Sequence, residues 1–113
     1  MLNDSHRLDR AFQALADPVR RGMLARLSLG SASVSELAQP LSISLPGVLQ
    51  HLKALEESGL VRSEKKGRVR TVQLRPKALS AAESWIADRR VEWEAQADRL
   101  EDYLTKLQTD GDQ

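Results

Sequence analysis

The sequence predicts a mainly α-helical α+β fold, in which short helices precede one small β-hairpin and a long helix follows it. Three patterns lead to this fold class. Apolar residues recur at helical spacing before residue 60, and polarity alternates among β-branched residues between residues 60 and 75. An apolar residue then recurs at every seventh position from residue 79 to residue 107. With 113 residues, the chain is expected to form one domain over residues 1–113.

Two helices are expected in the first 30 residues. Three apolar residues at helical spacing predict the first helix over about residues 6–16, namely Leu8, Phe12 and Leu15. Asp17 fits the N-cap of the second helix, because its carboxylate can accept hydrogen bonds from the free amides of the first turn. Gly30 is expected to close this helix. Its three arginines lie on the polar side, where we expect solvation for most of them.

A tight turn is predicted between two further helices. Ser33 and Glu36 match a capping box, in which each side chain satisfies the other residue's backbone amide. Pro40 must end this short helix, so that only residues 41–44 separate it from a longer helix over about residues 44–58. Two helices joined by so tight a turn meet at a steep angle, which is the helix-turn-helix arrangement.

The outward face of the helix over residues 44–58 is suited to reading DNA bases. Its inner stripe comprises Val48, Leu52 and Leu55, and its two acids, Glu56 and Glu57, are confined to the last turn. A slim, acid-free amino-terminal half can enter a major groove. The residues expected at the DNA are Ser44, Leu45, Gly47, Leu49, Gln50, His51 and Lys53.

Individual roles follow from the chemistry of these side chains. Gln50 can form a bidentate pair with adenine, and Leu49 can pack on a thymine methyl group. Lys53 is expected to meet phosphate. Considered alone, the helix fits an ordinary amphipathic surface helix equally well, and the tight turn before it is what favours DNA recognition.

The segment over about residues 60–75 is expected to form a hairpin that acts as a wing beside the helix. Residues 60–64 and 69–74 alternate in polarity, and residues 65–68 form the turn, in which Gly67 can adopt positive φ. Four bases at the tip are expected to contact phosphate or a minor groove, namely Lys65, Lys66, Arg68 and Arg70. The alternative is a hairpin tip that is merely solvated.

A long helix over about residues 77–107 is expected to form a dimer. Its heptad row comprises Leu79, Ile86, Trp93, Leu100 and Leu107. The other inner row is interrupted by Arg89 and Gln96, which favours packing on another helix of this protein or of its twin. So small a domain cannot bury the whole stripe, so a two-fold homodimer is expected. The interface residues are predicted to be Leu8, Phe12, Leu15, Ile86, Trp93, Leu100, Leu104 and Leu107.

Charge is divided unevenly along the chain, although the formal net charge is only +1. Residues 60–77 carry seven bases and one acid, whereas residues 78–113 carry four bases and nine acids. A short basic segment beside an acidic helix indicates one surface that meets a polyanion and another that faces away from it. Double-stranded DNA is the expected partner.

Several other functions are disfavoured by the composition. The absence of cysteine excludes disulfides, thiolate metal sites and thiol redox sensing. No apolar run reaches about 18 residues and the start lacks a signal-peptide core, so neither a membrane span nor secretion is expected and the protein is predicted to be cytoplasmic. Two unrelated histidines and no glycine-rich phosphate loop argue against an enzyme, and no cofactor is expected.

The order of motifs resembles the ArsR/SmtB-type winged helix-turn-helix transcriptional repressors of bacteria. The matching segments are ALADPVRRGMLARL, SVSELAQPLSIS, LPGVLQHLKALEESGLV and KKGRVRTVQL, followed by the long helix, so the resemblance covers about residues 8–107. The closing segment WIADRRVEWEAQADRLEDYL is similar to a branch without metal-binding cysteines. The resemblance implies a homodimer that binds a palindromic operator and is released by an effector, which it does not identify.

Some positions depart from the family's pattern. Leu49 stands where the family often has serine, and Gly47 stands where it often has alanine, so the operator cannot be carried over. Serines 33 and 35 occupy the region where metal-sensing members place cysteines, and hydroxyls do not replace thiolates for soft metals. No metal is therefore expected. His51 is the histidine usual in the family's recognition helix, where it is expected to bond a phosphate or brace the helix.

A second function remains open at this level. The same fold can serve as a dimeric protein-interaction module that has lost specific DNA binding. Binding to duplex DNA that weakens steeply with salt distinguishes the two, because contacts between cations and phosphates release counterions.

Overall fold

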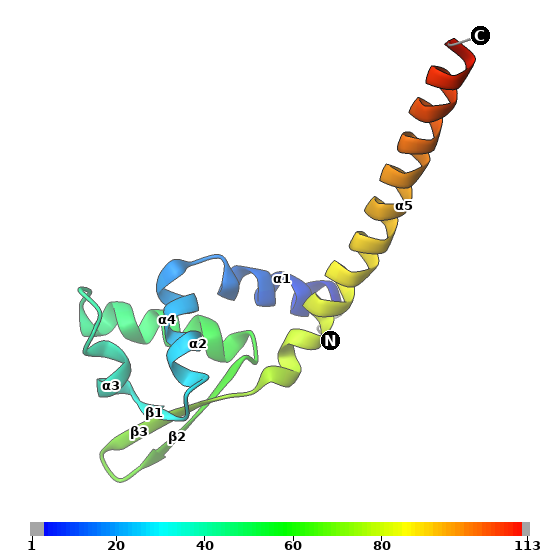
Figure 1. The fold of residues 1–113 in the computed structure, drawn as a ribbon. Coiled ribbons are helices and arrows are strands. Elements are labelled where there is room, and N and C mark those ends of the chain that lie inside the picture. The colour runs from blue at the N-terminus through cyan, green and yellow to red at the C-terminus, as the bar shows by residue number, and fades with distance from the viewer. Residues whose placement is uncertain (1–3, 112–113) are drawn as a thin grey trace. The chain divides into compact units, whose positions relative to one another are not determined.

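The computed structural model describes residues 4–111, which divide into a first unit that ends at Ala82 and a second that begins at Glu83 (Figure 1). The elements in chain order are α1 (Asp4–Leu15), α2 (Pro18–Leu27), β1 (Ala32–Ser33), α3 (Val34–Ala38), α4 (Leu45–Glu57), β2 (Val61–Lys66), β3 (Val69–Leu74), the 3₁₀ turn η1 (Pro76–Leu79) and α5 (Ser80–Gly111). The predicted mainly α fold with a small β-hairpin is confirmed. Helix α1 begins at Asp4, two residues earlier than expected.

Local side-chain caps fix the beginnings of α2 and α3. The carboxylate of Asp17 accepts hydrogen bonds from the amides of Val19 at 2.8 Å and Arg20 at 3.2 Å. Ser33 Oγ accepts from the Glu36 amide at 3.1 Å, and Glu36 Oε1 accepts from the Ser33 amide at 3.3 Å. The predicted N-cap and capping box are therefore both present.

Helix α4 is closed at both ends by local hydrogen bonds. Ser44 Oγ accepts a hydrogen bond from the Gly47 amide at 3.3 Å. At the other end the Leu60 amide donates to the Leu55 carbonyl at 3.2 Å and the Gly59 amide donates to Glu56 at 3.0 Å. These two bonds form a Schellman motif, which requires the positive φ of 81° that Gly59 adopts.

The sheet has three antiparallel strands in the order β1-β3-β2. Strand β1 is not predicted by the sequence, because its two residues acquire their strand geometry only by pairing with Thr71 and Val72 of β3. The hairpin also has a tighter turn than the four residues expected. Lys66 pairs with Val69, so the loop has two residues, and Gly67 at its first position has φ 62° as in a type II′ turn.

The hydrophobic core of the first unit lies where α2, α3 and α4 meet the sheet. Its buried residues include Val48, Leu52 and Leu55 of α4, together with Met23, Leu27, Leu37, Val61 and Val72. Burying each large side chain stabilises the fold by about 1.5–3 kcal/mol. The inner stripe of α4 is thus fixed, and its opposite side is directed away from the core.

The long helix differs from its predicted bounds of 77–107 at both ends. Pro76–Leu79 form a 3₁₀ turn, in which the Ala78 amide donates to the Arg75 carbonyl at 3.3 Å. Leu79 packs against the core of the first unit, so it does not belong to the exposed heptad row. At the carboxyl end α5 continues to Gly111, four residues beyond the expected end. Between residues 4 and 111, every helix is too short or too polar to traverse a lipid bilayer.

Candidate nucleic-acid interface

The amino-terminal half of α4 presents an exposed surface without acids. Leu45 is 56% exposed and Leu49 is 45% exposed, which is unusual for leucines on a helix whose inner stripe is fully buried. Gln50 and Lys53 are also exposed. In a major groove, such leucines can contact thymine methyl groups, and such a glutamine can form a bidentate pair with a base edge.

Ile43 is a residue of this surface that the sequence reading missed. It is 39% exposed and lies just before the N-cap. A Cβ added to Gly47 would lie 3.6 Å from Ile43 Cδ1 and 3.4 Å from Ser44 Oγ, which are ordinary contact distances. Ile43 therefore lies beside Gly47 at the start of α4 and adds apolar area there. The signal for it was weak, because a single isoleucine in a loop has no periodicity.

The acids of α4 are at its far end. Glu56 accepts a hydrogen bond from the hydroxyl of Ser63 in β2, which fixes its carboxylate against the sheet. Glu57 is exposed in the last turn. The negative charge of α4 is therefore separated by two turns or more from Leu45 and Leu49, as the sequence indicated.

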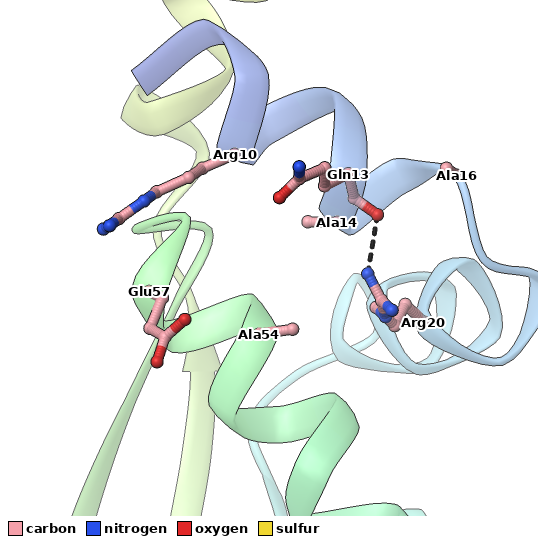
Figure 2. Close-up of a pocket in the computed structure, with 7 residues that line it drawn as sticks. All are labelled: Arg10, Gln13, Ala14, Ala16, Arg20, Ala54 and Glu57. Carbon is pink, nitrogen blue, oxygen red and sulfur yellow. Dashed lines mark hydrogen bonds between the residues drawn. The ribbon is translucent and has the colours of Figure 1, made fainter. Parts of the chain in front are cut away.

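His51 is braced from behind by α2. Its side chain is 22% exposed, and its Nδ1 accepts a hydrogen bond from Arg20 Nε at 3.2 Å. Arg20 also donates from Nη1 to the Gln13 carbonyl of α1 at 2.6 Å, as Figure 2 shows. One guanidinium thus joins α1, α2 and α4. We expected His51 to bond a phosphate or to brace the helix, and its hydrogen bond with Arg20 is a bracing contact.

Asp17 completes this group of side chains. Its Oδ1 lies 4.0 Å from His51 Nδ1. Burial raises the pKa of Asp17, but hydrogen bonds from the Arg20 and Val19 amides, with the nearby His51 ring and Arg20 guanidinium, outweigh it. The pKa of Asp17 therefore lies below its ordinary value.

Of the three arginines of α2, which we expected to be mostly solvated, Arg21 is exposed and Arg20 and Arg26 are partly buried, and each also forms a hydrogen bond. Arg20 makes the contacts just described, and Arg21 Nη1 donates to the Leu15 carbonyl at 2.7 Å. Arg26 forms an ion pair with Glu36 at 3.4 Å. Each guanidinium reaches a backbone carbonyl or a carboxylate that helix periodicity alone does not reveal.

The hairpin of β2 and β3 carries the predicted cations at its tip, which projects past the helices in Figure 1. Lys65, Lys66, Arg68 and Arg70 are all exposed. Within residues 4–111, none of the four forms an ion pair. Their positive charge is therefore available to an external anion.

The register of the hairpin places like charges opposite each other. Lys65 pairs directly with Arg70 across the two strands. Like charges at directly opposed positions destabilise a sheet, so this pair does not contribute to folding. A polyanion at the tip would neutralise both charges, which is the arrangement expected of a wing that contacts phosphates.

Helix α5 carries an exposed apolar row of its own. Its members from the predicted interface are Ile86, Trp93, Leu100, Leu104 and Leu107, and each is at least 48% exposed. Near the start of the helix, the Arg89 guanidinium lies 5.1 Å from the centre of the Trp85 ring and donates to Glu92 at 2.9 Å. An exposed row of large apolar side chains is typical of a surface that another chain covers.

The three apolar residues of α1 differ in their surroundings. All three are partly buried, and Leu15 packs against the core of the first unit. Each retains area that a partner can cover. In the described part of the chain, no three histidine, aspartate or glutamate side chains are grouped so as to hold a metal ion.

Comparisons with known proteins agree with this geometry. A family described as a helix-turn-helix domain matches residues 15–64. The chain is 48% identical over 73 residues to the HTH-type transcriptional regulator Rv2034 of Mycobacterium tuberculosis, an alignment that covers 65% of this chain and 68% of that one.

Solved structures extend the likeness to the fold. A crystal structure of an ArsR family transcriptional regulator superposes with a TM-score of 0.77 at 46% identity, covering 83% of this chain and 97% of the other. A solution structure of a homodimeric winged helix-turn-helix DNA-binding domain from Mycobacterium bovis gives a TM-score of 0.59 at 26% identity, covering 76% and 82%. The exposed face of α4, the cationic hairpin and these likenesses together show that this chain belongs to the ArsR family of winged helix-turn-helix, DNA-binding transcriptional regulators.

Proposed function

We propose that the protein is a homodimeric repressor that binds a palindromic operator. The observation that carries this proposal is that one unit combines an acid-free exposed helix face with a hairpin tip whose four cations form no ion pair within residues 4–111. Base-edge contacts come from Leu45, Gly47, Leu49 and Gln50. Phosphate contacts come from Ser44, His51, Lys53 and the cations of the wing.

The homodimer in this proposal is supported by the exposed apolar row of α5. A helix of 32 residues is about 48 Å long, and a row of that length is more than one small domain needs to bury. The similar domain from Mycobacterium bovis is itself homodimeric. Leu8, Phe12 and Leu15 of α1 are proposed to join the interface. Two copies related by a two-fold axis would aim their α4 helices at half-sites about 34 Å apart.

Selection from random duplexes tests the DNA part of the proposal. The purified chain is incubated with a library of random double-stranded oligonucleotides, and the retained fragments are sequenced. We expect enrichment of inverted repeats whose half-site centres lie about 10 base pairs apart. Retention of sequences without a common motif, or of single half-sites only, would contradict the proposal and favour the protein-interaction module.

Transcription in a purified system then tests repression. A promoter that overlaps the selected operator is transcribed with increasing amounts of the protein, and the same promoter with a scrambled operator serves as the control. We expect transcript levels to fall only with the intact operator. A rise would identify an activator instead.

A further inference from the structure

We propose that a hollow between α1 and α4 binds a small organic carboxylate and that this binding weakens the hold of α4 on its operator. The hollow has a volume of about 500 Å³, within the range of pockets that take small molecules. Figure 2 shows its walls: Arg10, Gln13 and Ala14 come from α1, and Ala54 and Glu57 come from α4. Arg20 of α2 closes the remaining side.

Small side chains create this space at the contact of two helices. Ala14 is almost fully buried and Ala54 is half-buried, so neither fills the gap between α1 and α4. The hollow is lined by both polar and apolar side chains. A ligand with a compact apolar body and one polar head matches such walls, because the body lies on the alanines and the head meets the guanidiniums.

The charge of the walls selects an anion. Within residues 4–111, the side chains of Arg10 and Glu57 form no hydrogen bond or ion pair. A second cavity of about 660 Å³ shares Arg10 and Glu57 as a common wall and is otherwise lined by Arg7, Arg75 and Lys77 among others. The two hollows together place five cations beside one acid. A planar carboxylate can accept two parallel hydrogen bonds from a guanidinium, which makes Arg10 its natural partner.

The hollow remains open in the proposed dimer. Arg10 lies two residues from Leu8 and two from Phe12, so it is about 160° around the helix from both. A partner that covers Leu8 and Phe12 therefore contacts the side of α1 opposite to Arg10. A ligand can enter with the two copies associated.

Arg20 connects the hollow to the DNA-contacting helix. Its guanidinium lines the hollow and at the same time donates from Nε to His51 Nδ1 at 3.2 Å. A carboxylate bound at Arg20 competes for this guanidinium, because the guanidinium bonds a carboxylate of opposite charge more strongly than it bonds a neutral ring. His51 then loses its brace, and α4 is held less firmly in the orientation that contacts DNA. This regulatory half rests on the proposed function, whereas the binding site itself does not.

Titration of the free protein with benzoate tests the site without DNA. Amide and guanidinium NMR signals of the ¹⁵N-labelled full chain are followed, with benzamide as the neutral control of the same shape and with ionic strength held constant. We expect saturable shifts at Ala14, Ala54 and Arg10 with benzoate and none with benzamide. Arg10→Gln should weaken benzoate about tenfold or more, and Glu57→Gln should strengthen it about threefold.

A variant that fills the space separates the hollow from general attraction to cations. Ala54→Leu leaves every charge in place and should abolish the shifts, with circular dichroism confirming that the variant is folded. The site would be overturned if the benzoate shifts persist in Ala54→Leu. It would also be overturned if Arg10→Gln binds benzoate as tightly as the parent protein, or if benzamide produces the same shifts as benzoate.

Operator binding in the presence of benzoate tests the coupling. We expect benzoate to lower operator affinity and the operator to lower benzoate affinity by the same factor, as linkage requires. In Arg10→Gln, benzoate should no longer change operator affinity. If benzoate binds in the hollow and operator affinity stays constant, the regulatory half is overturned. If the protein binds no operator at all, the proposed function fails and the benzoate titration still decides the site.

Discussion

Single side chains behind the DNA-contacting surface determine which hydrogen-bond donors that surface presents to DNA. Because His51 Nδ1 accepts from Arg20, a neutral His51 ring carries its hydrogen on Nε2. The contact therefore sets the tautomer, and the remaining ring N–H is the donor that a phosphate can use. Arg20, whose guanidinium holds His51, is a positioning residue for the interface.

Gln50 is the side chain with the most specific expected role. Gln50→Ala should relax base preference at one position of each half-site by about 1–3 kcal/mol, because a bidentate pair with adenine is lost. Competition binding against operators substituted at each position measures this change. Lys53→Ala is the matched control, since loss of a phosphate contact weakens all sequences alike. An unchanged base preference in Gln50→Ala would remove Gln50 from the reading set.

Asp17 is expected to make stability depend on acid. Its pKa is lowered in the folded protein, so the stabilisation is complete above the unfolded pKa of about 3.9 and is lost as pH falls through the folded value. Asp17→Asn keeps a capping oxygen but removes the charge. Urea unfolding should show the variant less stable at neutral pH, with the difference shrinking below about pH 4.

The comparison between Asp17→Asn and the parent protein isolates one carboxylate. The hydrogen bonds from Ser33 also lower the pKa of Glu36, but Glu36 titrates in both proteins and its contribution cancels. A difference in unfolding free energy that stays constant from neutral pH to about pH 2 would contradict the role assigned to the charge.

Residues whose partners are close in sequence were predictable, and residues with distant partners were not. Asp17 and Ser33 both act within one helical turn, so residue type and spacing identified them as caps. The bond between Arg20 and His51 spans 31 positions and depends on how α2 packs on α4. No local pattern contains that information.

At the scale of elements, the hairpin was predictable because its strands are neighbours in the sequence, whereas β1 was not because its partner strand is distant. Alternating polarity around Gly67 identified β2 and β3 and their cations, although the two-residue turn moves the end of β2 from the expected residue 64 to Lys66. Strand β1 has no alternation to read, because two residues are too few and their pairing with β3 crosses almost 40 positions. The charges at the tip are exposed and form no ion pair within residues 4–111. Their contribution to DNA binding can therefore be measured from the salt dependence of the affinity.

Arg68→Ala should weaken binding to all sequences alike and flatten the salt dependence. Removing one phosphate contact lowers the slope of log K against log salt by about 0.9. Arg62→Ala is the matched control, because Arg62 is an exposed arginine near the base of β2 and away from the tip. A loss confined to particular sequences would contradict the phosphate role, and an equal flattening in Arg62→Ala would show that the tip is not special.

At the scale of the whole molecule, the long helix determines what a second copy can cover. The heptad repeat predicted its row from Ile86 to Leu107, but counted Leu79 as well, which the 3₁₀ turn instead packs into the first unit. Periodicity could not distinguish Leu79 from the exposed row, because a leucine at a seven-residue interval can belong either to a core or to an interface. The residues that remain exposed on α5 are the ones whose burial requires another chain.

Trp93 is the most informative position in that row, because it is the largest side chain in it and is 63% exposed. Trp93→Glu should shift the protein from dimer to monomer in sedimentation at micromolar concentration, since association would bury an unpaired carboxylate in an apolar seam. Val91→Glu is the matched control: Val91 is 67% exposed on the same helix, yet lies about 160° around it from Trp93, so the same charge should leave the dimer intact.

Because two linked α4 helices bind paired half-sites far more tightly than one, Trp93→Glu should also lose preference for inverted repeats over single half-sites. If Trp93→Glu stays dimeric, or if both variants dissociate equally, the interface does not follow the heptad row and the two-fold arrangement on the operator has to be rebuilt from another surface.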